Sequence, residues 1–179
     1  ACATGLIALL QGALQIASGS CDVCIVGSSD AALRASVMSS FHRLRVTSRH
    51  EDAAMACRPF DESRDGFVIG EGAAVMILES REHLTRRKGR AIARVLGGGW
   101  LSDPTGMTQV DESGSVVKEV IQRTIAVTGV IPNLIGVHGT GTESNDLTES
   151  RGIAETESRD ALCFGMKGAL GHLLGAAGS

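Results

Sequence analysis

The sequence predicts an α/β fold, because short apolar runs typical of strands alternate with stretches of helical periodicity along the 179 residues. Apolar residues make up 43% of the chain and charged residues 21%, which excludes extended disorder. Aromatic residues contribute 3%, tyrosine is absent and glycine contributes 23 residues. We therefore expect a core of small side chains, with glycine wherever backbone must come close to another group.

The first expected element is a helix at residues 3–17, because apolar residues fall on almost every face of this stretch, as in a helix buried within a large protein. Residues 23–27 form a short apolar run that ends in glycine, which predicts a buried strand. The polar and basic residues 43–52 predict a surface loop. Residues 67–69 and 73–78 predict two further strands, separated by a short turn that contains two glycines.

The alternation continues to the end of the chain. A polar helix is expected at residues 79–88, a strand at 91–96, and a bend at the three glycines that follow. Valine and isoleucine at helical spacing predict a helix at 116–127. The remaining elements are a strand at 134–137, a helix at 146–157, a strand at 161–164 and a final helix studded with glycine.

Charge and cysteine content restrict the class of protein. The chain carries 17 basic and 20 acidic residues, and its net charge of -3 argues against a nucleic-acid binder that depends on bulk positive charge. No apolar run reaches the roughly 18 residues that cross a bilayer. The 5 cysteines are odd in number and widely spread, which indicates reduced thiols and hence a cytoplasmic location.

Two local motifs match known site patterns only in part. Cys21 and Cys24 have the C-x-x-C spacing of redox and metal sites, but no second pair of cysteines or histidines lies at zinc spacing. We therefore interpret Cys24 as a buried strand residue and predict no metal site. Gly27-Ser28-Ser29-Asp30-Ala31 resembles the G-x-S-x-G elbow of serine hydrolases, with alanine in place of the last glycine, so Ser29 stays open as an alternative nucleophile.

Three reactive side chains lie beside helix-terminal or glycine-rich backbone. Cys2 directly precedes the first expected helix, where the positive end of the helix dipole favours a thiolate. His138 ends an expected strand and enters Gly139-Thr140-Gly141-Thr142, and His172 lies in a glycine-rich segment near the end of the chain. Because glycine leaves room for a substrate to approach, these three residues are the candidates for catalysis.

Four motifs, taken in order, resemble the β-ketoacyl synthase family. They are Ala1-Cys2-Ala3-Thr4, Arg58-Pro59-Phe60-Asp61 followed by Arg64-Asp65-Gly66-Phe67, His138-Gly139-Thr140-Gly141-Thr142, and Lys167 to Gly178. The resemblance extends over essentially the whole chain and is strongest to the stand-alone type II enzymes of fatty acid or polyene synthesis. It implies a thiolase-like fold of two similar halves in α-β-α-β-α layers, of which this chain would be an incomplete central portion.

The same resemblance implies how the chain divides. Residues 1–88 would be the C-terminal part of the N-terminal half, starting at the nucleophile elbow, and residues 89–179 would be most of the C-terminal half. Family members are more than twice as long as this chain. The strand before Cys2 and the glycine-rich loop that supplies a second oxyanion donor would lie outside it.

The resemblance also implies a decarboxylative Claisen condensation. Cys2 would accept the acyl chain from a carrier-protein thioester, and its backbone N–H would form part of the oxyanion hole. His138 and His172 would bind the malonyl thioester carbonyl and promote loss of CO₂, since two histidines are the pattern of elongating members. This chemistry needs a soft thiolate and neutral imidazole N–H donors. It needs no cofactor, because phosphopantetheine arrives on the acyl carrier protein.

Four other residues receive roles from the resemblance. Lys167 with Asp146 and Glu149 would form a polar network that orients the histidines. Arg45 corresponds to a basic residue that contacts the acidic carrier protein. The expected partners are the carrier and a second subunit, in a homodimer or in a heterodimer with a related synthase-fold chain, and neither nucleic acid nor membrane is expected as a partner.

Two alternatives stay open. The first is a non-condensing member of the same fold, either an acyltransferase or a partner that sets chain length, although such partners typically lack the nucleophile that Cys2 supplies. The second is a serine hydrolase that uses Ser29.

Overall fold

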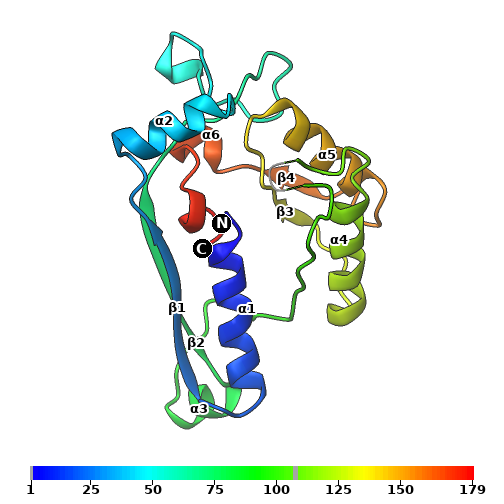
Figure 1. Cartoon of the computed structure of the whole chain (residues 1–179). Helices are drawn as coiled ribbons and strands as arrows, with labels where there is room; N and C mark the ends of the chain where they lie inside the picture. The colour runs from blue at the N-terminus through cyan, green and yellow to red at the C-terminus, as the bar shows by residue number, and fades with distance from the viewer. Residues whose placement is uncertain (1, 107–108) are drawn as a thin grey trace.

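The computed structural model describes residues 2–106 and 109–179 and has mixed α/β architecture, as the sequence predicts (Figure 1). Its elements form two groups. In the first, α1 (Thr4–Ala17) packs on an antiparallel pair of strands, β1 (Val23–Asp30) and β2 (Gly72–Glu79). In the second, α4 (Ser115–Thr128) packs on α5 (Glu143–Ala154), beside a parallel pair formed by β3 (Leu134–Gly136) and β4 (Leu162–Phe164).

Short helices complete the chain. They are α2 (Ala35–Arg43), the 3₁₀ turn η1 (Ala53–Met55), α3 (Arg81–Arg86), α6 (Lys167–Leu170) and the 3₁₀ turn η2 (Leu174–Ala176). The single glycine-studded helix expected at the end of the chain is therefore wrong. Gly171 has a φ of 73°, a left-handed conformation that ends α6 after one turn. The break between α6 and η2 leaves His172 outside any helix.

Three other expectations differ from the structure. Helix α2 was not expected, although Val37 and Phe41 are spaced four apart and both pack on the core. Residues 91–96 form no strand, because none of the described strands pairs with them, and Ile92 is fully exposed. Residues 67–69 make only two isolated bridges, Thr47↔Phe67 and Ile69↔His172, in place of a strand.

Glycine allows α1 to lie directly on β1. A Cβ atom at Gly12 would stand 2.3 Å from Val26 Cγ1, closer than Cβ atoms come in proteins, and 3.1 Å from Leu78 Cδ1. The register of the strand pair runs from Val23↔Glu79 to Asp30↔Gly72. The strand pair thus supports α1 at close range, and Cys2 lies just before the N-terminal end of this helix.

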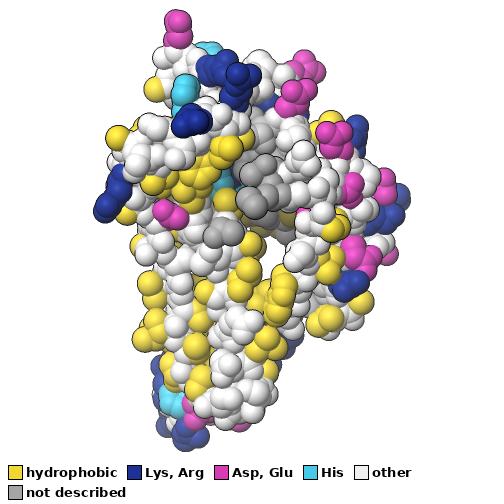
Figure 2. Space-filling view, viewed as in Figure 1, with side chains coloured by type: hydrophobic (Ala, Val, Ile, Leu, Met, Phe, Trp, Pro, Cys, Tyr) yellow, Lys and Arg dark blue, Asp and Glu magenta, His cyan; other side chains and the backbone are white. Residues whose placement is uncertain are grey.

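The strands and α1 are less buried than the sequence predicts. Only one face of the β1–β2 pair is covered by α1, and on the other face Ile25 is 72% exposed and Ile77 is 70% exposed. Leu6 and Leu14 of α1 are also exposed. Figure 2 shows exposed hydrophobic side chains along the part of the molecule that α1 and the strand pair form. None of the described helices packs on that outer face of the strand pair, and within residues 23–27 only Val26 is buried, so the expectation of a buried strand is wrong for most of this segment.

The best-buried apolar cluster lies beside His172. It consists of Ala32, Phe67 and Ile69, with Phe41 packed against it. The rings of Phe41 and Phe67 meet edge to face with 5.7 Å between centroids, and Phe67 meets the His172 ring in the same way at 5.0 Å. The cluster therefore fixes one side of that imidazole. Among the described residues, no helix is both long and apolar enough to span a bilayer.

Candidate active site

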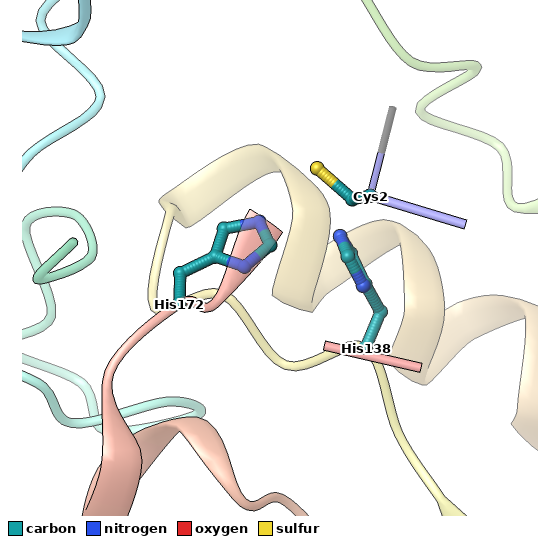
Figure 3. Close-up of side chains that lie close together, drawn as sticks. All are labelled: Cys2, His138 and His172. Atoms are coloured by element: carbon teal, nitrogen blue, oxygen red, sulfur yellow. The ribbon is translucent and has the colours of Figure 1, made fainter. Parts of the chain in front are cut away.

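Cys2, His138 and His172 come together from three distant parts of the chain. Each offers one side-chain atom, and these three atoms lie within 4.8 Å of one another. Figure 3 shows both imidazoles beside the Cys2 side chain. The two rings are nearly perpendicular, with centroids 5.4 Å apart. The sequence named these residues as its catalytic candidates, and the structure brings all three into one cluster.

The backbone delivers each side chain in a different way. Cys2 lies just before the N-terminal end of α1, where the free N–H groups of the first helical turn produce a positive potential. His138 directly follows the segment that carries β3, and Gly139 after it has a φ of 44°, which turns the chain sharply away. His172 lies between α6 and η2.

Hydrogen bonds fix both the position and the tautomer of His172. Its backbone N–H donates to the Val68 carbonyl at 2.7 Å, and its carbonyl accepts from Gly70 at 3.0 Å. The ring atom Nδ1 accepts from the backbone N–H of Leu174 at 3.2 Å. A neutral imidazole that accepts at Nδ1 carries its proton on Nε2. His172 is therefore held as an Nε2–H donor.

Lys167 sets the same tautomer in His138. The Lys167 ammonium donates to the backbone carbonyl of His138 and lies 3.4 Å from its Nδ1. Because an ammonium group has donors only, His138 Nδ1 must accept, and the proton again lies on Nε2. The lysine predicted to support the histidines thus contacts His138 directly.

Burial keeps both imidazoles neutral. Desolvation and, to a smaller extent, the nearby charge of Lys167 lower the pKa of His138 to about 4, against an opposing effect of Asp146. Desolvation likewise lowers the pKa of His172 to about 3, with smaller contributions from His138 and Lys167. Near neutral pH, the site therefore contains two uncharged imidazoles that can each donate from Nε2.

Glu149 holds the turn that follows β3. Its carboxylate accepts from the backbone N–H of His138 at 2.5 Å and from that of Gly139 at 2.8 Å. Burial raises the pKa of Glu149, and burial lowers the pKa of Lys167. The half-buried Glu149 and the buried Lys167 bind the N–H and the carbonyl of the same residue, so together they fix the backbone of His138.

Asp146 bonds the backbone of two loops beside the histidines. Its side chain is 1% exposed and accepts from the backbone N–H groups of Phe60 at 2.7 Å and Gly141 at 3.1 Å. It also pairs with Arg64, whose Nε lies 3.5 Å away. No hydrogen bond or ion pair joins it to Lys167 among the described residues. Asp146 therefore clamps the loop after His138 to the loop that contains Phe60 and Arg64.

The donor set of the three-residue cluster suits an oxygen anion better than a metal ion. A histidine that ligates a metal through Nε2 usually donates its Nδ1–H to a carbonyl or carboxylate. Here the partner of His172 Nδ1 is a backbone N–H, and the partner of His138 Nδ1 is an ammonium group. Both partners are donors. A metal ion bound at Nε2 would leave the ring proton on Nδ1, where this N–H would face another donor instead of an acceptor.

The other candidates lie outside this cluster. Arg45 is exposed just after α2, with a φ of 57°. Ser29 lies within β1, paired with Ala73, and no described histidine bonds to its hydroxyl. Cys24 is half-buried, and desolvation together with the Cys24 thiol raises the pKa of Cys21. The structure thus gives Ser29 none of the partners of a catalytic serine.

Sequence reasoning missed two contributors to the site. Arg64 belongs to one of the four motifs, and the structure shows that it pairs with Asp146. Leu174 has no predicted role, although its N–H fixes the tautomer of His172. Its position two residues after a candidate histidine was the only available signal.

Comparisons with known proteins show the family of the chain. Residues 1–83 match the family model of the β-ketoacyl synthase N-terminal domain, and residues 92–179 match that of the C-terminal domain. The chain is 37% identical to 3-oxoacyl-[acyl-carrier-protein] synthase 2 of Mycobacterium tuberculosis, over 100% of this chain and 44% of the relative. The chain thus spans less than half the length of this curated relative.

Two solved structures show the same fold. One is a ketosynthase in complex with its type II polyketide synthase acyl-carrier protein and bound to the hexaketide, with a TM-score of 0.94 and 33% identity. The match covers 98% of this chain and 45% of that ketosynthase chain. The other is the ishigamide ketosynthase/chain length factor, with a TM-score of 0.81 and 31% identity over 98% of this chain and 43% of that one.

Proposed function

The chain belongs to the β-ketoacyl synthase family, and from this we propose that it carries the catalytic cysteine and histidines of a β-ketoacyl-[acyl-carrier-protein] synthase. It has the thiolase-like fold of the ketosynthases that it resembles in structure. One observation supports the assignment most directly. Both buried imidazoles accept a hydrogen bond at Nδ1 and so carry a donor at Nε2, beside the Cys2 thiol.

The reaction would begin with transfer of the acyl chain. The Cys2 thiolate attacks the thioester carbonyl of the acyl carrier protein, and the carrier's phosphopantetheine thiol leaves as the acyl group becomes bonded to sulfur. The Cys2 backbone N–H, just before the first turn of α1, is one donor to the oxyanion of the tetrahedral intermediate.

Decarboxylation and condensation would follow at the same cluster. The Nε2–H groups of His138 and His172 donate to the thioester oxygen of malonyl carrier protein, so the enolate that forms on loss of CO₂ is stabilised. Its α-carbon attacks the acyl-Cys2 carbonyl, the carbon–sulfur bond breaks, and the Cys2 thiolate is regenerated. Neutral imidazoles suit this step, because each ring can accept a hydrogen bond at Nδ1 and still donate from Nε2 to the enolate oxygen.

Supporting roles follow from the contacts described above. Lys167 and Glu149 would hold His138 through its backbone, and Asp146 would fix the loop that follows it. We assign residues 1–88 to the N-terminal half of the fold and 89–179 to the C-terminal half. The two family models, which end at residue 83 and begin at residue 92, support a boundary near this point.

The proposed partners are an acyl carrier protein and a second synthase-fold subunit. A ketosynthase of similar structure was solved with its acyl-carrier protein, and another with a chain length factor. Arg45, exposed after α2, would contact the acidic carrier. The chemistry needs no bound cofactor, since the phosphopantetheine arm belongs to the carrier. The cytoplasmic location expected from the cysteines stays a prediction.

The test uses the full-length protein with acyl and malonyl carrier proteins. Iodoacetamide should label Cys2 and abolish condensation, and Cys2→Ala, His138→Ala and His172→Ala should each remove the β-ketoacyl product. Full condensation after stoichiometric labelling of Cys2 would refute the proposal. Acyl transfer without any condensation would instead favour the non-condensing alternative. Ester hydrolysis lost only in Ser29→Ala would favour the serine hydrolase.

A further inference from the structure

The turn that follows His172 is strained. Leu174 has a φ of 49°, a left-handed conformation that is unfavourable for a residue with a branched side chain. Such a residue persists only where its surroundings hold it in place, and such strain clusters at functional sites. Leu174 is also the residue whose N–H fixes the tautomer of His172. The contacts that hold this turn therefore bear on the imidazole.

Two consecutive backbone N–H groups of the turn are held by side chains. The first, from Leu174, donates to His172 Nδ1 at 3.2 Å. The second, from Gly175, donates to Asp30 Oδ2, also at 3.2 Å. Since neighbouring peptide planes share a Cα atom, fixing the Gly175 N–H also limits the rotation of the plane that carries the Leu174 N–H.

Asp30 reaches the turn from a different element. It is the last residue of β1, its backbone is paired with Gly72, and its side chain is half-buried. A Cβ atom at Gly175 would lie 3.3 Å from Asp30 Oδ2 and 3.8 Å from Thr4 in the first turn of α1. Figure 1 shows the C-terminal segment between the end of β1 and the start of α1. Asp30 thus lies where the nucleophile helix, the sheet and the His172 turn meet.

We propose that Asp30 is a positioning residue for His172. By holding the Gly175 N–H, its carboxylate keeps the strained turn in the conformation in which the Leu174 N–H stays on Nδ1. The Nε2–H of His172 then remains directed at the reacting oxygen near Cys2. This inference rests on the proposed function, because it names the residue that aligns one of the two decarboxylating imidazoles.

Kinetics of the full-length protein test the proposal. In Asp30→Ala, kcat for malonyl-carrier decarboxylation and for condensation should fall by about tenfold or more, while KM for malonyl carrier changes less than about twofold. The rate at which iodoacetamide labels Cys2 should not change, because the nucleophile is not moved. Asp30→Asn keeps an acceptor oxygen and should recover much of the lost rate. Asp22→Asn, which removes a carboxylate bonded to Ser80 and Arg86 just before β1, is the matched control and should behave as wild type.

A spectroscopic measurement separates positioning from a general loss of structure. With ¹⁵N-labelled histidine, His172 should show an unprotonated, hydrogen-bonded Nδ1 in the wild type and a mixture of tautomers in Asp30→Ala. Wild-type decarboxylation together with an unchanged Nδ1 signal in Asp30→Ala would overturn the inference and leave the proposed function intact. A wild-type protein that does not condense would refute the proposed function, and the Nδ1 signal would still decide whether Asp30 positions the ring.

Discussion

Replacing Asp146 by alanine removes a buried acceptor on which two loops depend. Its carboxylate, 1% exposed, takes the backbone N–H groups of Phe60 and Gly141 and pairs with Arg64. Alanine has no acceptor and no charge, so it fills none of these roles. The variant therefore leaves two donors unpaired in the interior and removes the ion-pair partner of a largely buried guanidinium group.

The magnitude follows from these contacts. A buried donor left without an acceptor costs about 1–3 kcal/mol, so the two backbone N–H groups together cost about 2–6 kcal/mol. The side chain of Arg64 is 15% exposed, and the loss of its partner moves the expected value toward the upper end of that range. Asp146→Asn keeps one acceptor oxygen, so we expect it to lose about half as much.

Urea unfolding of the full-length protein, followed by circular dichroism, measures the change in the free energy of unfolding. Asp160→Ala is the matched control, because the Asp160 side chain is 94% exposed and its pair with Arg159 spans 3.9 Å. The control should change stability by less than about 0.5 kcal/mol. If Asp146→Ala lowers the free energy of unfolding by no more than Asp160→Ala does, the Asp146 carboxylate does not hold the two loops together.

Three further outcomes follow from the structure. Burial lowers the pKa of His172 to about 3, whereas an unfolded histidine takes up a proton near pH 6.5, so the unfolded state binds more protons between these values. The free energy of unfolding should therefore fall as the pH drops from about 6.5 toward 3. This fall should be steeper in wild type than in His172→Gln, and an equal dependence on pH of the unfolding free energies measured in urea would contradict the expectation. Gly12→Ala places a Cβ atom 2.3 Å from Val26 Cγ1 and should lower the unfolding free energy by about 1–3 kcal/mol, whereas Gly99→Ala, whose nearest neighbour is 4.0 Å away, should not. Arg45→Glu should weaken carrier-protein binding by about tenfold at low salt and by less at high salt, as measured by titration, and an unchanged affinity at low salt would remove Arg45 from the interface.

Elements with a strong local signal were predictable from the sequence. The apolar stretch that became α1 and the periodic valines and isoleucines of α4 lie within a few residues of their expected positions. The strand predicted at residues 91–96 is wrong, because a strand depends on a pairing partner that a local pattern does not reveal. The continuous helix predicted at the end of the chain is wrong, because Gly171 has a positive φ that ends the helix there.

The sequence likewise predicts the catalytic candidates but not the long-range contacts that hold them. Cys2, His138 and His172 stand out because each is a reactive side chain in a distinctive local setting, and the structure brings them together. The contacts of Asp146 with Phe60 and of Asp30 with Gly175 join residues 86 and 145 positions apart. Such contacts arise only when the chain folds, and no spacing rule within one sequence predicts them.

Cys2→Gln in the full-length protein tests the central claim most directly. The variant lacks the nucleophile but keeps both Nε2–H donors, so malonyl carrier protein should lose CO₂ while no β-ketoacyl product forms. Adding His172→Ala to Cys2→Gln should then abolish the release of CO₂ as well. Condensation by Cys2→Gln, or loss of CO₂ that continues at the same rate without His172, would contradict the division of labour between the cysteine and the two histidines.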